Sequence, residues 1–181
     1  MLLPIVEGHA EERSIPVLMR RMNVAVLKPY RVKRNSVVKP GELERTLQGA
    51  LAQRPETTSV LVLLDVDDDC AAKLGPELLK RAGSVTRFPV SVVFAVRELE
   101  AWFLGGLESL RGHRGVVADA AYPDDPEQPR GAKERLRAFI TGRTYVDTDD
   151  QPALMAALDI DAARARCPSL DKLMRDLETM G

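Results

Sequence analysis

The sequence predicts an α/β protein in which a mainly parallel sheet is flanked by helices and followed by a helical C-terminal extension. Three continuous apolar runs, the pattern of strands that are covered on both faces, occur at residues 2–6, 59–64 and 89–96. Segments with apolar residues at helical spacing separate these runs. Apolar strands that alternate with amphipathic helices indicate a parallel sheet between layers of helices.

The first part of the chain supplies the strands and helices of this sheet. Helices are expected at residues 10–22, 40–54 and 71–82, and in the segment after residue 96. That last helix is expected to contain Trp102, Phe103, Leu104 and Leu107, with Trp102 and Phe103 as core residues. Residues 24–38 are mixed in character and fit a strand with an irregular loop.

Beyond residue 112 the sequence changes character. Two loops rich in Pro or Asp, YPDDPEQPRG and TYVDTDDQP, separate segments with helical spacing. Helices are expected at 132–140, 152–158 and 169–177. A length of 181 residues is close to that of one domain. We therefore predict a single compact domain, with an α/β core over 1–112 and a helical extension over 113–181 packed on it.

Composition restricts the function classes. The net charge is −1, whereas proteins that coat nucleic acid non-specifically are usually strongly basic. Any contact with nucleic acid must therefore come from a local patch. No apolar run approaches the roughly 18 residues that a membrane-spanning helix needs. The two cysteines, Cys70 and Cys167, form no CxxC pair and are expected to be reduced thiols in a cytoplasmic protein.

Acidic residues follow each of the three predicted strands. They are Glu7 and Glu11, then Asp65, Asp67 and Asp69, then Glu98 and Glu100. In a parallel α/β sheet the carboxyl ends of the strands meet at one edge, where ligands bind. Crowded carboxylates repel one another unless a cation neutralises them, and hard oxygen ligands suit Mg²⁺ or Mn²⁺. The pattern predicts a site for one or two divalent metal ions, as in enzymes that cleave phosphodiesters.

The first two acidic clusters also have structural interpretations. Glu7 could simply end a strand in water, and Glu11 could be a first-turn acid that the helix dipole favours. Asp69 could be a helix N-cap. Asp65 and Asp67 are the most specific pair, because a strand sends both side chains to the same side; their alternative is capping and turn chemistry.

The third cluster does not fit on one face of a helix. Glu98 and Glu100 are two residues apart, so on a helix they cannot face the same way. One of them is then expected only to favour the start of the helix.

The segment 13–39 contains eight basic residues and no acidic residue. Blocks of one sign often contact nucleic acid, although a solvated helix face with a basic loop would look the same. Nucleic-acid contacts are expected from this segment and from one arginine after the third strand, namely Arg13, Arg31, Lys33, Arg34, Lys39 and Arg97. Arg13 and Arg97 could instead pair with the neighbouring carboxylates.

Three motifs, IVEGHAEE, LVLLDVDDD and VRELEAWFL, together resemble a bacterial family, domain of unknown function family 4276. That family is similar to the Toprim superfamily, the catalytic domain shared by topoisomerases, primases and nucleases of the overcoming-lysogenization-defect type. The resemblance covers residues 2 to about 107, and a weaker match, CPSLDKLMRDL, lies near the end. It implies a Toprim-like fold.

The resemblance also implies roles for individual residues. Glu7 would be a metal ligand or general acid/base, and Asp65 and Asp67 would be the DxD metal ligands, which makes these three the expected catalytic residues. Glu11 would complete an ExxxE pattern like that of the nuclease branch. The pair in the ELEAW segment, Glu98 and Glu100, is carried over with the other metal ligands.

The resemblance leaves the lysine that some Toprim nucleases use without an assigned position. Lys133 and Lys172 are the candidates. Where the family usually has a tyrosine–lysine segment, this chain has Tyr145, Val146 and Asp147. Small Toprim-like proteins of this kind look like partners of ATPases in phage-defence systems, so the resemblance implies an ATPase partner.

The leading functional hypothesis is a Mg²⁺- or Mn²⁺-dependent phosphodiesterase, a nuclease acting on DNA or RNA. One alternative is a non-catalytic binding or assembly module. Another is a phosphatase of the haloacid dehalogenase type, with Asp65 as nucleophile and Asp67 as general acid. Against that reading, a strand ending in Glu7 precedes the motif, and Asp68 and Asp69 stand where a Thr is expected.

Overall fold

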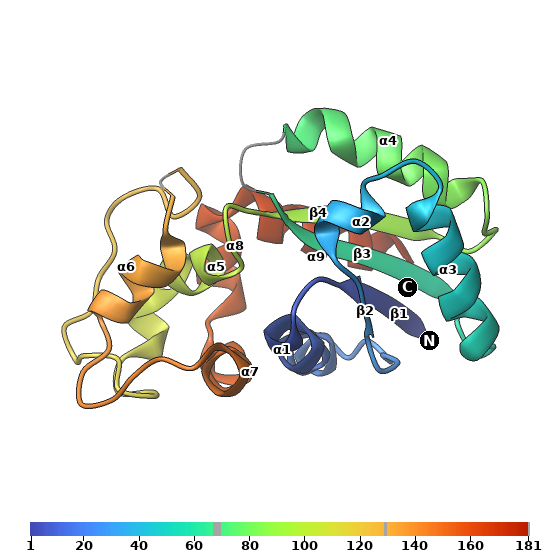
Figure 1. The fold of residues 1–181 in the computed structure, drawn as a ribbon. Helices are drawn as coiled ribbons and strands as arrows, with labels where there is room; N and C mark the ends of the chain where they lie inside the picture. The colour runs from blue at the N-terminus through green and yellow to red at the C-terminus, as the bar shows by residue number, and fades with distance from the viewer. Residues whose placement is uncertain (67–69, 129, 181) are drawn as a thin grey trace.

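A parallel sheet forms the centre of the molecule (Figure 1). The computed structural model describes residues 1–66, 70–128 and 130–180, and within them the sheet has four strands in the order β2-β1-β3-β4. Two of the predicted site residues, Asp67 and Asp69, lie outside the described residues. The strands are β1 (Leu2–Val6), β2 (Tyr30–Arg31), β3 (Ser59–Val66) and β4 (Val90–Val96). All pairs are parallel, which confirms the predicted fold class.

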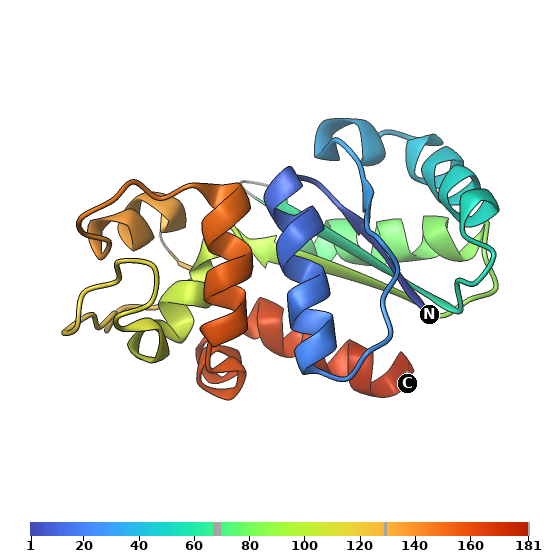
Figure 2. The ribbon, with the colours of Figure 1, turned by 90° about the horizontal axis from the view of Figure 1, so that it is seen from below.

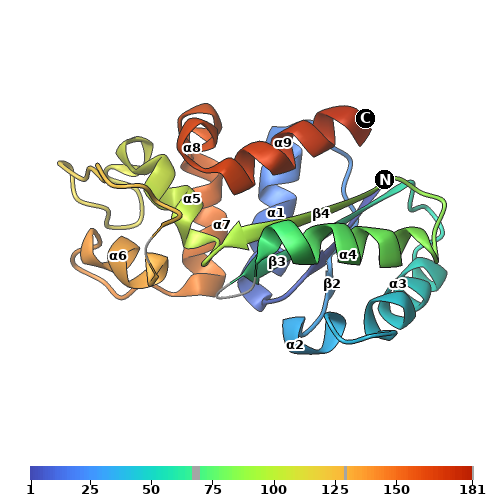
Figure 3. The ribbon, with the colours of Figure 1, turned by 90° about the horizontal axis from the view of Figure 1, so that it is seen from above.

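Helices cover both faces of the sheet because side chains alternate between the two faces of each strand. Leu61 and Leu63 of β3 pack on the face that carries α1 (His9–Arg21) and α9 (Pro168–Met180). Val60, Val62 and Leu64 pack on the opposite face, against α3 (Glu42–Gln53) and α4 (Ala71–Gly83). Figure 3 shows β4 running between α4 and α9.

The mixed segment 24–38 forms less regular structure than its neighbours. It contains the two-residue strand β2 and a short helix, α2 (Arg34–Val37). Ile5 of β1 pairs with Tyr30, so this segment completes one edge of the sheet.

The segment after β4 extends beyond the carboxyl ends of the strands, and its last helix, α9, returns to pack on the sheet (Figure 1). It contains α5 (Glu100–Gly105), the 3-10 helix η1 (Leu107–Leu110), α6 (Ala132–Ala138), α7 (Asp147–Ala157), α8 (Ile160–Arg166) and α9. Trp102 and Phe103 are fully buried, as expected. One cluster of buried side chains runs from β1 through α5 to α9, and Figure 2 shows α7 lying alongside α1. Residues beyond 112 thus share the core of the sheet.

Three elements differ from the sequence-based expectation. The helix after β4 ends at Gly105, where α8 packs so closely that a Cβ would lie 2.6 Å from Cys167 Sγ. Helix α7 begins at Asp147, five residues before the expected start, because acids occupy its first turn and Asp150 accepts the backbone N–H of Val146 at 2.6 Å. Helix α8, which was not expected, is capped by Asp159.

The described helices include none that combines the length and the apolar character that a membrane crossing requires.

Candidate functional site

A cavity of about 270 Å³ opens where β1, β3 and β4 end. Glu7 directly follows β1, Asp65 is the penultimate residue of β3, and Glu98 lies two residues beyond β4. The acidic side chains that line the cavity are Glu7, Glu11, Asp65, Glu98, Glu100 and Asp147. The parallel topology therefore brings together described members of the three acidic clusters that the sequence places far apart, with Asp65 representing the second cluster.

The third cluster is arranged differently from the expectation for a helix. Helix α5 begins at Glu100, so Glu98 precedes it, and both side chains line the cavity. Arg97 has a φ of 69°, a left-handed conformation that a non-glycine residue adopts at a cost. Its N–H donates to the Val66 carbonyl at 2.9 Å, which ties this turn to the end of β3. The turn is what allows two acids in nearby positions to reach one cavity.

Glu100 is held by two donors from the later part of the chain. Its Oε1 atom accepts hydrogen bonds from Tyr145 Oη at 3.0 Å and from Gln151 Nε2 at 3.1 Å. Ser14 Oγ donates to Gln151 Oε1 at 3.3 Å, which fixes the orientation of that amide. Burial raises the pKa of Glu100, and the hydrogen bonds from Gln151 and Tyr145 and the charge of Lys133 oppose this rise. Glu100 is only 2% exposed.

Tyr145 supports the same arrangement as a donor. Burial, followed by the charge and hydrogen bond of Glu100, raises the pKa of Tyr145 above its usual value. The phenol therefore keeps its proton and donates a hydrogen bond to the Glu100 carboxylate.

Asp65 lies among the other acids of the cavity. Burial raises the pKa of Asp65 well above its usual value, and the charges of neighbouring carboxylates raise it further. These neighbours are Glu11, Glu100, Glu7 and Glu98. The ionised form of Asp65 is thus disfavoured both by lost solvation and by like charge.

Lys133, at the start of α6, places a cation in this acidic cavity. Its backbone N–H donates to Glu98 Oε2 at 2.9 Å, and its Nζ pairs with Asp147. Burial alone would lower the pKa of Lys133, but the Asp147 hydrogen bond and the charges of Glu100, Asp147 and Glu98 outweigh it and raise the pKa. The other candidate, Lys172, lines a different cavity and pairs with Asp176 at 2.5 Å.

The six predicted nucleic-acid residues do not line the cavity in the part of the chain that the structure describes. Arg31 contacts His9, which does line the cavity. Arg13 pairs with Asp149 at 2.9 Å. Lys33 and Arg34 lie at the start of α2, the Lys39 carbonyl accepts from Arg81, and Arg97 follows β4.

Part of the basic segment has a structural use. Arg21 donates to the backbone carbonyls of Met155 at 2.9 Å and of Leu158 at 2.6 Å, which joins α1 to the end of α7. Two of the eight basic residues, Arg13 and Arg21, therefore join α1 to α7.

The carboxylate oxygens that line the cavity are suited to a hard cation. The acidic side chains offer only oxygen, which Mg²⁺ and Mn²⁺ prefer. Burial raises the pKa of Asp65, and the charges of the neighbouring carboxylates raise it further. Within residues 1–66, 70–128 and 130–180, no three His, Cys, Asp or Glu side chains are already arranged to hold a metal ion. Asp67 and Asp69, the other expected ligands of the second cluster, lie outside the described residues.

Several lining residues were missed from the sequence. Asp147, Thr148 and Gln151 belong to α7 and reach the cavity because that helix packs on α1. Their segment was expected to be a loop. Its run of acids in the first helical turn is the signal that could have identified the start of the helix.

Comparison with known proteins identifies a family. The family model described as Domain of unknown function (DUF4276) matches residues 6–178. No curated protein and no solved structure matches the chain. The resemblance that the three motifs carry is thereby confirmed at the level of this family.

Proposed function

We propose that this chain, which belongs to the DUF4276 family of domains of unknown function, is a Toprim-like nuclease, a phosphodiesterase that depends on Mg²⁺ or Mn²⁺ and acts on DNA or RNA. The observation that carries the proposal is the shared cavity, in which Glu7, Asp65 and Glu98 project from the ends of three different strands. A fold that only needed these acids for solubility would leave them in water.

Electrostatics supports a divalent cation as a counter-charge in this cavity. At an effective dielectric constant of about 20, two like charges about 4 Å apart repel by about 4 kcal/mol. Five carboxylates from the strand ends line one cavity, and among the described lining residues Lys133 is the one lysine or arginine. Lys133 is already paired with Asp147. A bound divalent ion would offset the remaining repulsion and lower the pKa of Asp65.

The residues that could hold such ions are the acids of the three clusters, namely Glu7, Glu11, Asp65, Asp67, Asp69, Glu98 and Glu100. When bound, the ions would activate a water and stabilise the leaving oxygen of an in-line displacement. In the hydrolysis, the hydroxyl of the water bonds to phosphorus, the P–O bond to the leaving group breaks, and the leaving oxygen takes the proton of the water. Lys133 and His9 line the cavity, and Arg31 contacts His9. In this proposal these residues would bind phosphate oxygens of the substrate.

An ATPase partner and a place in phage defence rest on the family resemblance, and they remain predictions about a larger assembly. The nuclease proposal can be tested without that partner.

The direct test is cleavage of plasmid DNA and of single-stranded RNA by the purified chain with Mn²⁺ or Mg²⁺. The wild type should cleave one of them and lose activity with a chelator. Asp65→Asn keeps the side-chain shape, removes the charge, and should reduce cleavage by at least about 100-fold, the scale of losing a metal ligand or its support. The matched control is Glu56→Gln, at an exposed acid outside the cavity.

Two results would contradict the proposal. Equal cleavage by Asp65→Asn and the wild type would remove the site from the reaction or indicate a contaminating nuclease, and equal loss in Glu56→Gln would show that the loss is not specific to the cavity. Calorimetric binding of Mn²⁺ by the wild type without cleavage of either substrate would instead support the non-catalytic binding module.

A further inference from the structure

A second cavity lies at the β4 edge of the sheet, between α4 and α9 (Figure 3). Its volume is about 440 Å³, within the range of roughly 300–1,000 Å³ that small-molecule sites occupy. Val92 and Phe94 of β4 line it and are 4% and 5% exposed, whereas Ala72 and Leu79 of α4 line it and are exposed. The cavity therefore opens to solvent beside α4 and is closed by apolar side chains of the strand.

Glu127 supplies a buried acid to this apolar cavity. It is 8% exposed, and within the described part of the chain it forms no ion pair with a lysine, arginine or histidine. Lys172 also lines the cavity, but it pairs with Asp176 at 2.5 Å. Burial raises the pKa of Glu127, and the two hydrogen bonds from Ser169 oppose this rise. A buried carboxylate that has no cation beside it is unfavourable.

A chain of hydrogen bonds determines which oxygen of Glu127 remains available. The indole N–H of Trp102, which can only donate, donates to Ser169 Oγ at 2.7 Å. The Ser169 hydroxyl therefore donates its own hydrogen to Glu127 Oε1, and the Ser169 backbone N–H donates to the same oxygen at 3.1 Å. Among the described residues, Oε2 has only a contact of 3.4 Å with that N–H, longer than an ordinary hydrogen bond. Oε2 is thus the oxygen that a ligand could use.

The structural use of Glu127 does not account for its charge. Through Oε1 it caps the start of α9. The amide oxygen of a glutamine would accept the same two hydrogens from Ser169 without the cost of burying a carboxylate. The negative charge therefore adds a feature that the cap does not need, at the wall of an apolar cavity. A ligand that complements these features has a positively charged donor and an apolar body.

We propose that this cavity binds a small organic amine, whose ammonium group donates to Glu127 Oε2 and whose apolar body packs on Val92 and Phe94. Hydrogen bonds between an ammonium group and a carboxylate are stronger than those between neutral groups, and the apolar body gains by leaving water. Among the described residues, this cavity and the strand-end cavity share no lining residue. The amine site is therefore independent of the proposed nuclease reaction.

Titration of the isotope-labelled full chain, followed by NMR, tests the proposal. Trp102 is the one tryptophan of the sequence and gives a single indole N–H signal, and Ser169 links that N–H to Glu127. Phenethylamine is the probe, and phenethyl alcohol has a similar shape without the charge. The amine should shift the Trp102 signal saturably, with a dissociation constant at least about 10-fold below that of the alcohol, the scale of one charge-assisted hydrogen bond.

Glu127→Gln separates the amine site from the helix cap. Its amide oxygen keeps the hydrogen bonds of Ser169, and its amide nitrogen replaces Oε2, so the variant should fold. The dissociation constant of phenethylamine should rise about 10-fold or more, and that of phenethyl alcohol should not change. Glu178→Gln is the matched control, because it removes an exposed acid of α9 that lies outside the cavity. It should change neither constant.

Gly75→Leu tests the cavity itself. A Cβ at Gly75 would lie 3.8 Å from Phe94 Cε2, an ordinary contact, so α4 can accept a side chain that extends into the cavity. Leucine also favours a helix over glycine. This variant should bind neither probe. The proposal is overturned if the wild type binds neither probe, or binds the amine and the alcohol alike. It is also overturned if Glu127→Gln or Gly75→Leu binds phenethylamine as tightly as the wild type.

Discussion

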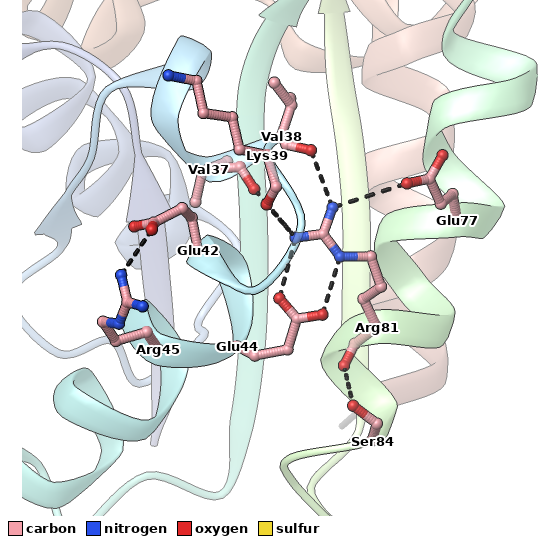
Figure 4. Close-up of polar contacts among 9 residues, drawn as sticks. All are labelled: Val37, Val38, Lys39, Glu42, Glu44, Arg45, Glu77, Arg81 and Ser84. Atoms are coloured by element: carbon pink, nitrogen blue, oxygen red, sulfur yellow. Dashed lines mark hydrogen bonds and ion pairs between the residues drawn. The ribbon is translucent and has the colours of Figure 1, made fainter.

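Glu44 and Asp65 are two carboxyl groups whose pKa values the fold shifts in opposite directions. Glu44 of α3 accepts hydrogen bonds from Arg81 Nε and Nη2, each at 2.9 Å, and Arg81 also donates to backbone carbonyls of the segment before α3 (Figure 4). The Arg81 hydrogen bonds lower the pKa of Glu44 to about 2. Burial and four neighbouring acids instead raise the pKa of Asp65 well above its usual value.

The difference separates a carboxylate that holds the fold from one that is available for chemistry. Arg81 neutralises Glu44 and links α4 to α3 and to residues 37–39, so the charge of Glu44 is used inside the chain. Asp65 faces other acids, and Lys133 is the one lysine or arginine among the described residues that line the same cavity. A carboxylate that lies among other acids, as Asp65 does among the described residues, favours a bound cation, whereas a carboxylate paired with an arginine, like Glu44, indicates a structural role.

The largest expected effect on stability comes from removing the Glu44–Arg81 contact. Arg81→Met should lower the free energy of unfolding by about 3 kcal/mol, because it leaves Glu44 and the carbonyls of Val38 and Lys39 without their donor. Arg45→Met is the control in the same region. Arg45 pairs with Glu42 at 2.5 Å on an exposed surface, which contributes about 0–1 kcal/mol. Urea denaturation measures both, and equal losses would contradict the assignment.

Acid should weaken the same contact. Because the folded pKa of Glu44 is depressed from 4.5 to about 2, its stabilising contribution is complete above pH 4.5 and is lost as the pH falls through 2. Allowing for solvent screening at this partly exposed pair, we expect a loss of about 2 kcal/mol. The difference in unfolding free energy between wild type and Glu44→Gln should shrink to zero over this window. A difference that is independent of pH would refute the ion-pair interpretation.

The sequence predicted the position of the strand-end acids better than it predicted the Glu44–Arg81 contact. Glu7, Asp65 and Glu98 follow apolar strands, and the rule that parallel strands end at one edge was enough to place them together. Lys133 and Gln151 could not be placed in this way. Their positions depend on how α6 and α7 pack on the sheet domain, and that packing is set by long-range contacts such as those of Arg21 with the carbonyls of α7 and Leu158.

The same limit applies to the Glu44–Arg81 contact. The two residues are 37 positions apart and lie on helices whose faces were predictable. Their relative rotation depends on how α3 and α4 share one face of the sheet. Side chains attached to strand ends inherit the geometry of the sheet, whereas contacts between helices require the whole fold.

Removing a charge from the strand-end cavity should change the free energy of unfolding in the opposite direction to Arg81→Met. Asp65→Asn should raise the free energy of unfolding in metal-free buffer by about 1 kcal/mol, because it relieves like-charge repulsion at a poorly solvated site. Adding Mn²⁺ should stabilise the wild type and have a smaller effect on this variant. Thermal melts with and without Mn²⁺ measure both effects. A destabilised Asp65→Asn that responds to Mn²⁺ like the wild type would place Asp65 with Glu44, among the structural carboxylates.

The smallest expected effect tests whether the later part of the chain orients the acids of the cavity. Tyr145→Phe removes one of two hydrogen bonds to Glu100 Oε1 and leaves that of Gln151, so the Mn²⁺ dissociation constant should rise about threefold, within the usual range of one hydrogen bond. Tyr122→Phe is a closely matched control. Tyr122 is 5% exposed and Tyr145 is 4% exposed, but within the described part of the chain the buried Tyr122 hydroxyl has no hydrogen-bond partner.

The two tyrosines should therefore respond differently to the loss of the same atom. Tyr122→Phe removes a buried polar group that lacks a partner, so stability should stay equal or rise and Mn²⁺ affinity should not change. Tyr145→Phe should weaken Mn²⁺ binding, measured by calorimetry, and Gln151→Ala should weaken it further in the double variant, because both side chains hold the same oxygen. If Tyr145→Phe and Tyr122→Phe bound Mn²⁺ alike, Tyr145 would be a packing residue, and the orientation of Glu100 would have to come from α5 alone.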